Sequence, residues 1–116
     1  MVKTQLGLEE NIEGALCYLF GFITGIVFYV MEPKNKFVRF HAMQSIIVFL
    51  PLMIIGFIFS SIGWFIFMGP AWLIISIIGW IIWILFFILW LILMLKAYNG
   101  EKFKLPIAGD IAEKNS

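Results

Sequence analysis

The sequence predicts an all-α integral membrane protein with three transmembrane helices in a small bundle. Of its 116 residues, 63% are hydrophobic and only 13% are charged, whereas soluble domains have about half apolar and about a quarter charged residues. Two stretches, residues 14–31 and 46–95, contain no charged residue. Helices satisfy their own backbone groups and can therefore cross lipid. We expect residues 1–116 to form a single membrane domain.

The first expected span covers residues 14–31. These 18 residues, at about 1.5 Å each, give a helix of roughly 27 Å, close to the ~30 Å thickness of the hydrocarbon core. Glu9, Glu10 and Glu13 precede this stretch. A cleavable signal has a basic start followed promptly by a short apolar core. We therefore expect no cleaved leader.

Residues 46–95 predict two further spans. These 50 uncharged residues are too many for one helix across a bilayer and enough for two. Gly69 and Pro70 supply a break near the middle, because proline lacks a backbone donor and glycine suits a helix end. The second span is expected at 46–68 and the third at 71–95.

The basic residues predict an orientation in the plasma membrane. With three spans, the N-terminal segment and the turn at Gly69 share one side, which carries Lys3 alone. The other side carries Lys34, Lys36, Arg39, Lys96, Lys102, Lys104 and Lys114. Basic residues concentrate in cytoplasmic loops. We therefore expect residues 32–45 and the tail, residues 96–116, in the cytoplasm, and the N-terminus outside.

Small residues and tryptophans recur on one face of each expected span. At about 100° per residue, each set falls within a narrow part of the helix circumference, and small residues let helices approach closely. Tryptophan has two further roles in membranes, as an anchor at the interface or as the lining of a groove for lipid or an apolar ligand. The candidate packing residues are Gly14, Gly21 and Gly25, then Gly56, Ser60 and Gly63, and last Trp72, Ser76, Gly79, Trp83 and Trp90.

The segment EPKNKFVRFHAMQS, before the second span, holds a polar constellation. Asn35 is placed to cap a helix that runs on into the second span. The candidate site residues are Arg39, His41, Gln44 and Ser45. His41 has two interpretations: a proton acceptor or pH sensor, or a hydrogen-bonded interface residue beside an arginine that reaches lipid headgroups. We expect short interfacial helical segments here and at the C-terminus.

No group of residues predicts catalysis, a metal site or a cofactor. Metal sites generally need three or four ligands, and His41 has no second histidine or carboxylate at helical spacing. Cys17 is the single cysteine. The formal charge of +1 provides no dense basic patch for nucleic acid. The expected partners are the lipid bilayer and either another membrane protein or a second copy of the chain.

Three stretches carry a resemblance to a known family: CYLFGFITG at 17–25, FVRFHAMQS at 37–45 and FKLPIAGDIAE at 103–113. They resemble small prokaryotic membrane proteins related to the Tic-twenty subunit of the chloroplast import machinery. The resemblance implies a helical membrane domain and, in the plastid relatives, participation in moving proteins across a membrane. The family pattern falls on Phe37, Arg39, Phe40, His41, Gln44 and Ser45.

These observations favour a non-enzymatic structural or assembly module similar to a protein-import component. The alternative is a small oligomeric transporter or ion channel in which His41, Gln44 and Ser45 line the entrance to a polar path. One chain offers few groups for such a path, since the expected second and third spans add only Ser60, Ser61 and Ser76, so conduction would require an oligomer.

Overall fold

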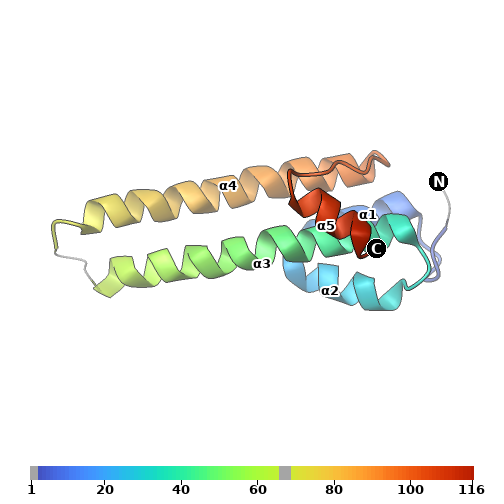
Figure 1. The fold of residues 1–116 in the computed structure, drawn as a ribbon, viewed down its shortest axis with the longest axis horizontal. Helices are drawn as coiled ribbons and strands as arrows, with labels where there is room; N and C mark the ends of the chain where they lie inside the picture. Colours follow the sequence, from blue (N-terminus) through green and yellow to red (C-terminus); the bar gives the residue numbers. More distant parts are fainter. Residues whose placement is uncertain (1–2, 66–68) are drawn as a thin grey trace.

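The computed structural model describes residues 3–65 and 69–116, and this part of the chain is helical with no β-sheet. The elements are α1 (Glu10–Leu19), α2 (Phe22–Met31), α3 (Lys36–Phe65), α4 (Trp72–Tyr98) and α5 (Ala108–Lys114). The molecule is elongated, with extents of 55 × 23 × 22 Å. Figure 1 shows that α3 and α4 run along the whole long axis, while the three short helices gather at one end.

The helices α3 and α4 form a long antiparallel hairpin (Figure 1). The predicted break at Gly69 and Pro70 lies between them, and the Trp72 N–H donates to the Gly69 carbonyl oxygen (3.2 Å). Both helices are long and apolar enough to cross a membrane. Their most apolar stretches are largely exposed, as at Phe65, so these helices are not the covered core of a soluble protein.

The helix that was predicted to form the second span, at residues 46–68, begins earlier than expected. The structure starts α3 at Lys36, so the helix that Asn35 was predicted to cap runs on into the second span, and the short interfacial segment expected here forms the first turns of α3. Asn35 caps it as predicted, with its Oδ1 accepting the Val38 N–H (3.0 Å). The expected end at residue 68 lies outside the described residues. The last long helix runs from Trp72 to Tyr98, slightly past the expected 71–95.

The prediction of three transmembrane helices is not confirmed, because residues 14–31 do not form one helix. The chain leaves α1 after Leu19 and turns back at Gly21, whose φ of 63° favours glycine. The Ser45 hydroxyl donates to the Gly21 carbonyl oxygen (2.7 Å). At about 1.5 Å per residue, each ten-residue helix spans only about 15 Å. The pair is a half-length helical hairpin.

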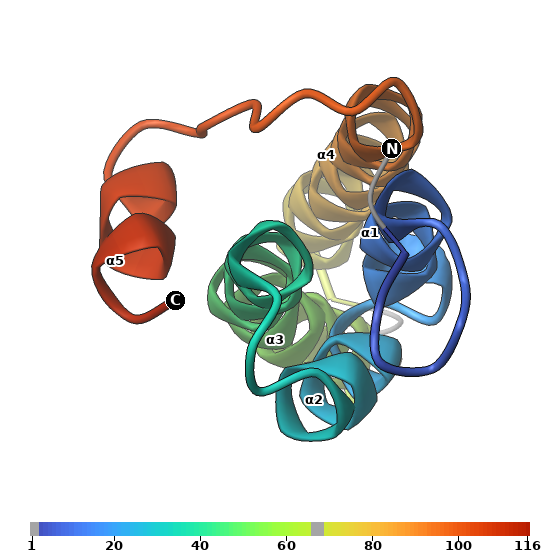
Figure 2. The ribbon, with the colours of Figure 1, turned by 90° about the vertical axis from the view of Figure 1, so that its right-hand side faces the viewer.

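Figure 2 looks along the molecule from the end where the short helices gather. Here α4, α1, α2 and α3 surround a common interior, and α5 packs on the outer side of α3. The short C-terminal helix matches the prediction. The other half of the molecule consists of α3 and α4 alone (Figure 1). The structure therefore divides into a capped half and a bare two-helix half.

The buried core lies in the capped half. Its larger apolar cluster contains Tyr18, Val48, Phe49, Leu93 and Ala97, and therefore joins α1, α3 and α4. A second cluster contains Cys17, Val38 and Ala42. The same end thus carries both the packed interior and the short helices.

Gly25 sets the closest approach between α2 and α3. A Cβ atom at this position would lie 2.9 Å from the Ala42 carbonyl oxygen and 2.9 Å from the Ser45 Oγ. Because the first of these is a backbone atom, it cannot move away without shifting α3. By contrast, a Cβ at Gly79 would meet only Phe59, at an ordinary contact distance of 3.7 Å.

We predict that Gly25→Ala destabilises the protein by about 1–3 kcal/mol, the usual cost of overpacking. Gly79→Ala is the matched control, and we expect it to be neutral or slightly stabilising because alanine favours helices. Thermal unfolding in detergent micelles, followed by labelling of the buried Cys17 thiol, measures both. Equal melting temperatures for the two variants would contradict the close approach of α2 to α3.

Candidate functional site

A network of hydrogen bonds joins α1, α3 and the C-terminal tail inside the capped half. Its centre is the Tyr18 hydroxyl, which lies 2.8 Å from His41 Nδ1 and 3.0 Å from Gln44 Nε2. All three side chains are fully buried. His41 and Gln44 lie one turn apart on α3, as the sequence predicts, and Tyr18 reaches them from α1.

The partners fix the protonation of His41. Its Nε2 lies 3.0 Å from the Glu101 carbonyl oxygen, which can only accept, so Nε2 carries a hydrogen. The Gln44 amide donates to the Tyr18 oxygen, and the Tyr18 O–H is then free to donate to Nδ1. Every donor meets an acceptor if the imidazole is neutral. This arrangement fits the interpretation of His41 as a hydrogen-bonded interface residue better than that of a proton acceptor open to water.

Gln44 ties the tail to α3. Its Nε2 donates to the Phe103 carbonyl oxygen (2.9 Å), and its Oε1 accepts the Leu105 N–H (3.0 Å). Together with the bond from His41 to Glu101, these contacts lay the extended residues 101–105 along α3, from the end of α4 to the start of α5. One glutamine thus satisfies two backbone groups of a segment that has no regular structure of its own.

The other two candidate residues stand outside this network. Ser45 binds the Gly21 turn, as described above. Arg39 stacks on the Tyr29 ring, with its guanidinium carbon 3.9 Å from the ring centroid, and its Nη1 donates to the Tyr29 carbonyl oxygen (2.8 Å). Its Nε donates to the Ser116 carbonyl oxygen (3.3 Å). Arg39 therefore joins the end of α2 to the end of the chain.

Sequence reasoning missed Tyr18 and the backbone of the tail. Tyr18 stands in an apolar run, and a buried tyrosine hydroxyl usually has a hydrogen-bond partner, which is the one signal available in the sequence. The tail contributes through backbone atoms, whose identity no side chain reveals. Cys17, next to Tyr18, donates its thiol hydrogen to the Val38 carbonyl oxygen (3.7 Å).

The predicted packing residues occupy two places. In the capped half, Gly14 faces Phe37, His41 and Ala97, while the Trp90 indole N–H donates to the Leu19 carbonyl oxygen (3.3 Å). The bare half has a groove of about 460 Å³ between α3 and α4. Six of the predicted packing residues line it: Ser60, Gly63, Trp72, Ser76, Gly79 and Trp83.

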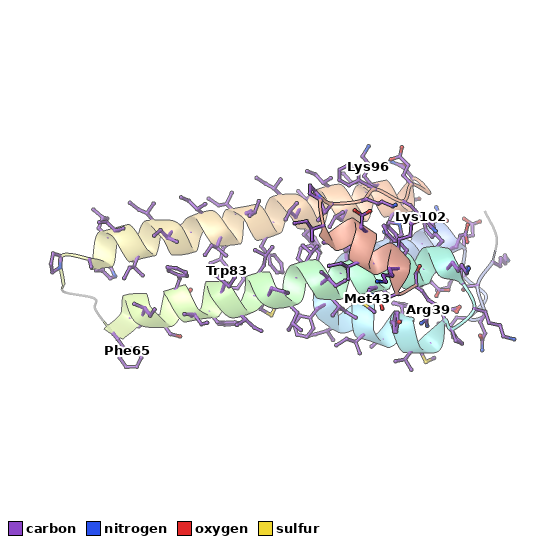
Figure 3. All side chains as sticks on the ribbon, viewed as in Figure 1. Arg39, Met43, Phe65, Trp83, Lys96 and Lys102 are labelled. Atoms are coloured by element: carbon purple, nitrogen blue, oxygen red, sulfur yellow. The ribbon has the colours of Figure 1, made fainter. Side chains whose placement is uncertain are left out.

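Trp83 lines this groove at its end nearer the capped half, and its side chain lies between α3 and α4 (Figure 3). Its ring packs on Gly56, where an added Cβ would lie 2.8 Å from the indole, and its N–H donates to the Ser60 Oγ (3.3 Å). Trp64 and Trp80 also line the groove and are largely exposed. The groove is therefore an aromatic surface that opens outward from the hairpin.

Comparison with known proteins places the chain in a family. Residues 9–112 match the magnetosome magnetite crystal formation protein family, MamF/MmsF. The chain belongs to this family. The matched region includes α1 to α4 and most of α5, so the MamF/MmsF family is defined over both the capped half and the bare hairpin. No solved structure matches the chain.

The relatives with curated names are archaeal membrane proteins. A UPF0132 membrane protein of Methanocaldococcus jannaschii is 53% identical over 116 residues, which cover 100% of this chain and 96% of the relative. A second protein of that name in the same organism is 47% identical over 94% of this chain and 71% of the relative. One from Archaeoglobus fulgidus is 46% identical over 92% and 95%. With the two apolar helices, these names show a membrane protein.

The resemblance to the Tic-twenty superfamily is wrong. The family match is to MamF/MmsF, and the relatives are UPF0132 membrane proteins. Apolar stretches with glycines and a short polar segment are common to many small membrane proteins, so the quoted stretches were too unspecific to separate the families. The expectation of a role in protein translocation rested on this resemblance and therefore has no support.

We predict that Tyr18→Phe lowers the free energy of unfolding by about 1–3 kcal/mol, because it leaves His41 Nδ1 buried without a donor. Tyr29→Phe is the control. The Tyr29 hydroxyl donates to the Asn115 carbonyl oxygen at an exposed site (2.8 Å), so we expect a smaller loss. Unfolding with sodium dodecyl sulfate in mixed micelles measures both, and equal losses would contradict the central role of Tyr18.

We predict that Gln44→Leu releases the tail from α3. Leucine has a side-chain volume similar to that of glutamine but makes none of the three hydrogen bonds of the Gln44 amide. Hydrogen exchange at the Leu105 N–H, followed by mass spectrometry of the tail, should accelerate by at least about tenfold, the change for a loss of about 1.4 kcal/mol. Helix α4 serves as the internal reference. Unchanged exchange at residues 101–105 would show that the tail is held by other contacts.

Proposed function

We propose that this protein is a non-enzymatic membrane scaffold whose bare α3–α4 half assembles with another membrane-embedded helix. One observation carries the proposal. The capped half completes its own packing with four helices, whereas the other half leaves a groove open between two helices. The groove is lined by small residues, which let a further helix approach closely, and by tryptophans, which supply a large contact area.

The distribution of charge supports a topology for this scaffold. No charged residue occurs between Phe40 and Leu95. All the charges therefore fall in the N-terminal segment, α1, the loop between α2 and α3, the first turns of α3, the end of α4 and the tail. Figure 3 shows Arg39, Lys96 and Lys102 at the end opposite Phe65. Basic residues favour the cytoplasmic side, so we infer that the whole capped half faces the cytoplasm.

This topology differs from the expected one at the N-terminus. Because α1 and α2 double back at Gly21, the N-terminal segment lies at the same end as residues 32–35, and the Asn35 amide donates to Glu10 Oε2 (3.2 Å). We therefore propose that α3 and α4 are the two full spans and that α1–α2 is a re-entrant hairpin. Such backbone is tolerated at membrane depth where protein covers it. Both termini then lie in the cytoplasm.

The closed polar network supports assembly over transport. A conducting path needs polar groups that remain open to water or to the passing ion. The polar atoms of His41, Gln44 and Ser45 instead form hydrogen bonds with Tyr18, the tail and the Gly21 turn. These are the residues that the transporter alternative would use. We therefore propose that the network fastens the cap and does not line a path.

The names of the relatives also favour a shared structural role. The family description refers to magnetite crystal formation in magnetosomes, whereas the archaeal relatives are named only as membrane proteins. Because one family carries both kinds of name, we propose that the common element is the membrane scaffold and that mineral formation is a specialised use of it. Fold by itself does not transfer a specialised function.

We predict that a fluorescent reporter that matures only in the cytoplasm is active at both the N-terminus and the C-terminus. A reporter that acts only outside the cytoplasm should be active when it is inserted between Gly69 and Pro70. Reporter activity normalised to protein level in membranes measures each fusion. An N-terminal fusion that is active only outside the cytoplasm would restore the topology with three spans.

We predict that groove filling disrupts assembly. Gly79→Phe places a ring in the groove, whereas Ile81→Phe adds a similar volume at an exposed position on α4. Chemical crosslinking of the full chain in its membrane, followed by electrophoresis, should show a specific larger species for the wild type and for Ile81→Phe, and its loss for Gly79→Phe. A monomer without any crosslinked partner in all three proteins would contradict the scaffold proposal.

A further inference from the structure

The outer face of α2 is apolar and is not covered by the part of the chain that the structure describes. Four side chains on this face are exposed: Ile23, Ile26, Val27 and Val30. At about 100° per residue, they fall within roughly 100° of the helix circumference. Gly25 lies on the opposite side and faces α3. The helix α2 therefore packs on the protein with one face and leaves an apolar face open.

Contacts with α4 fix how far the hairpin of α1 and α2 reaches along the long helices. At its open end, the Asn11 amide donates to the Tyr98 carbonyl oxygen (2.9 Å). At its tip, a Cβ on Gly21 would lie 3.5 Å from the Phe86 ring. From Leu95, where the uncharged part of α4 ends, the helix rises about 14 Å to Phe86. Because the hydrocarbon core is ~30 Å thick, the hairpin reaches about half-way across it.

The surroundings of the open face favour lipid as its occupant. At the level of the hairpin, α4 exposes apolar side chains at Leu91, Ile92 and Leu95, and α4 is one of the two helices apolar enough to cross a membrane. The Arg39 guanidinium stacks on Tyr29, near the end of α2, so a basic group marks the level of the lipid headgroups. The open face of α2 therefore continues the apolar surface of α4 and ends where the charges begin.

The two leaflets consequently contain unequal amounts of protein. The half of the membrane that holds the hairpin contains α1, α2, α3 and α4, whereas the other half contains α3 and α4 (Figure 1). A helix with its side chains is about 10 Å across, so each additional helix occupies roughly 80 Å² of one leaflet. At the same end, α5 packs on the outer side of α3 (Figure 2) and widens it further. The chain thus has the form of a wedge whose broad end is the capped half.

We propose that this wedge makes the protein favour curved membrane, with the capped half in the convex leaflet. Headgroups spread apart in a convex leaflet, and an apolar helix inserted there fills the space that opens between them, which is why such insertion is sensitive to curvature. With the topology proposed above, the convex leaflet is the cytoplasmic one. The inference rests on that topology of two full spans but not on assembly through the groove, because a single chain already has the wedge shape.

A spin label at Val27→Cys, in a Cys17→Ser background in lipid bilayers, tests what covers the open face. Power saturation in electron paramagnetic resonance should show strong relaxation by molecular oxygen, which dissolves among acyl chains, and little by a water-soluble nickel complex. Gln5→Cys, at an exposed position of the N-terminal segment, should show the opposite. Access of the nickel complex to position 27 would overturn insertion of the hairpin, and shielding from both reagents would overturn lipid as the occupant.

Sorting between flat and curved membrane tests the wedge itself. The full chain, with a fluorophore on Ser116→Cys in the same background, is reconstituted into giant vesicles of phosphatidylcholine and phosphatidylglycerol, and a thin tether is pulled outward from each vesicle. Fluorescence before and after an impermeant quencher separates the two orientations. Chains with the capped half outside should be enriched in the tether at least about twofold, because insertion of apolar helices depends on curvature, and reversed chains should be depleted. Equal densities for both orientations would overturn the proposal.

Two pairs of exposed positions provide matched variants that change the wedge without touching the core. Ile23→Trp combined with Val27→Trp broadens the capped half and should increase the enrichment. Ile74→Trp combined with Ile77→Trp broadens the bare half outside the groove and should reduce it. A change in the same direction for both double variants would contradict the wedge.

Gly79→Phe separates the wedge from assembly. This variant fills the groove and, under the scaffold proposal, abolishes the crosslinked species, but it leaves the hairpin in place. We expect it to enter the tether as the wild type does. Sorting that is lost together with the crosslinked species would show that the preference for curvature belongs to the assembly, and would overturn this inference while leaving the scaffold proposal intact.

Discussion

A polar group held away from water must find its partner inside the protein, and the capped half of this molecule depends on that requirement. Tyr18, His41 and Gln44 meet it together. Their contacts join α1 to α3 and attach the tail to α3. Removing one member leaves another buried without a partner, which costs more than the bond itself contributes. The network therefore couples the positions of α1, α3 and the tail to one another.

The long hairpin was predictable from the sequence because its causes are local. Fifty uncharged residues, with a break at Gly69 and Pro70, leave few alternatives to two antiparallel helices. Asn35 predicts the start of α3, because its side chain can cap a helix and does so here. The first element was not predictable in the same way. A run of 18 apolar residues has the same composition whether it crosses the membrane once or forms two half-length helices.

What decides between these forms is a set of contacts distant in sequence. Gly21 looks like one more small residue in a packing stripe, and only the bond from Ser45, 24 positions later, shows that its backbone forms a turn. For the same reason, the sequence predicted only part of the candidate site. His41 and Gln44 are adjacent on one helix face, but Phe103 lies 59 positions from Gln44 and contributes a backbone oxygen that every residue type possesses.

The two halves of the molecule differ in what they contain. The capped half holds the charges, the buried polar groups and the tail, and the bare half carries an apolar groove between α3 and α4. This division depends on α1 and α2 returning to the end from which they start.

Spin labels at Gln5→Cys and Lys34→Cys, in a Cys17→Ser background, test the reversal directly by pulsed electron resonance in lipid bilayers. Both positions line one cavity, so we expect a short distance. A separation greater than about 27 Å, the length of a straight helix over residues 14–31, would contradict the hairpin.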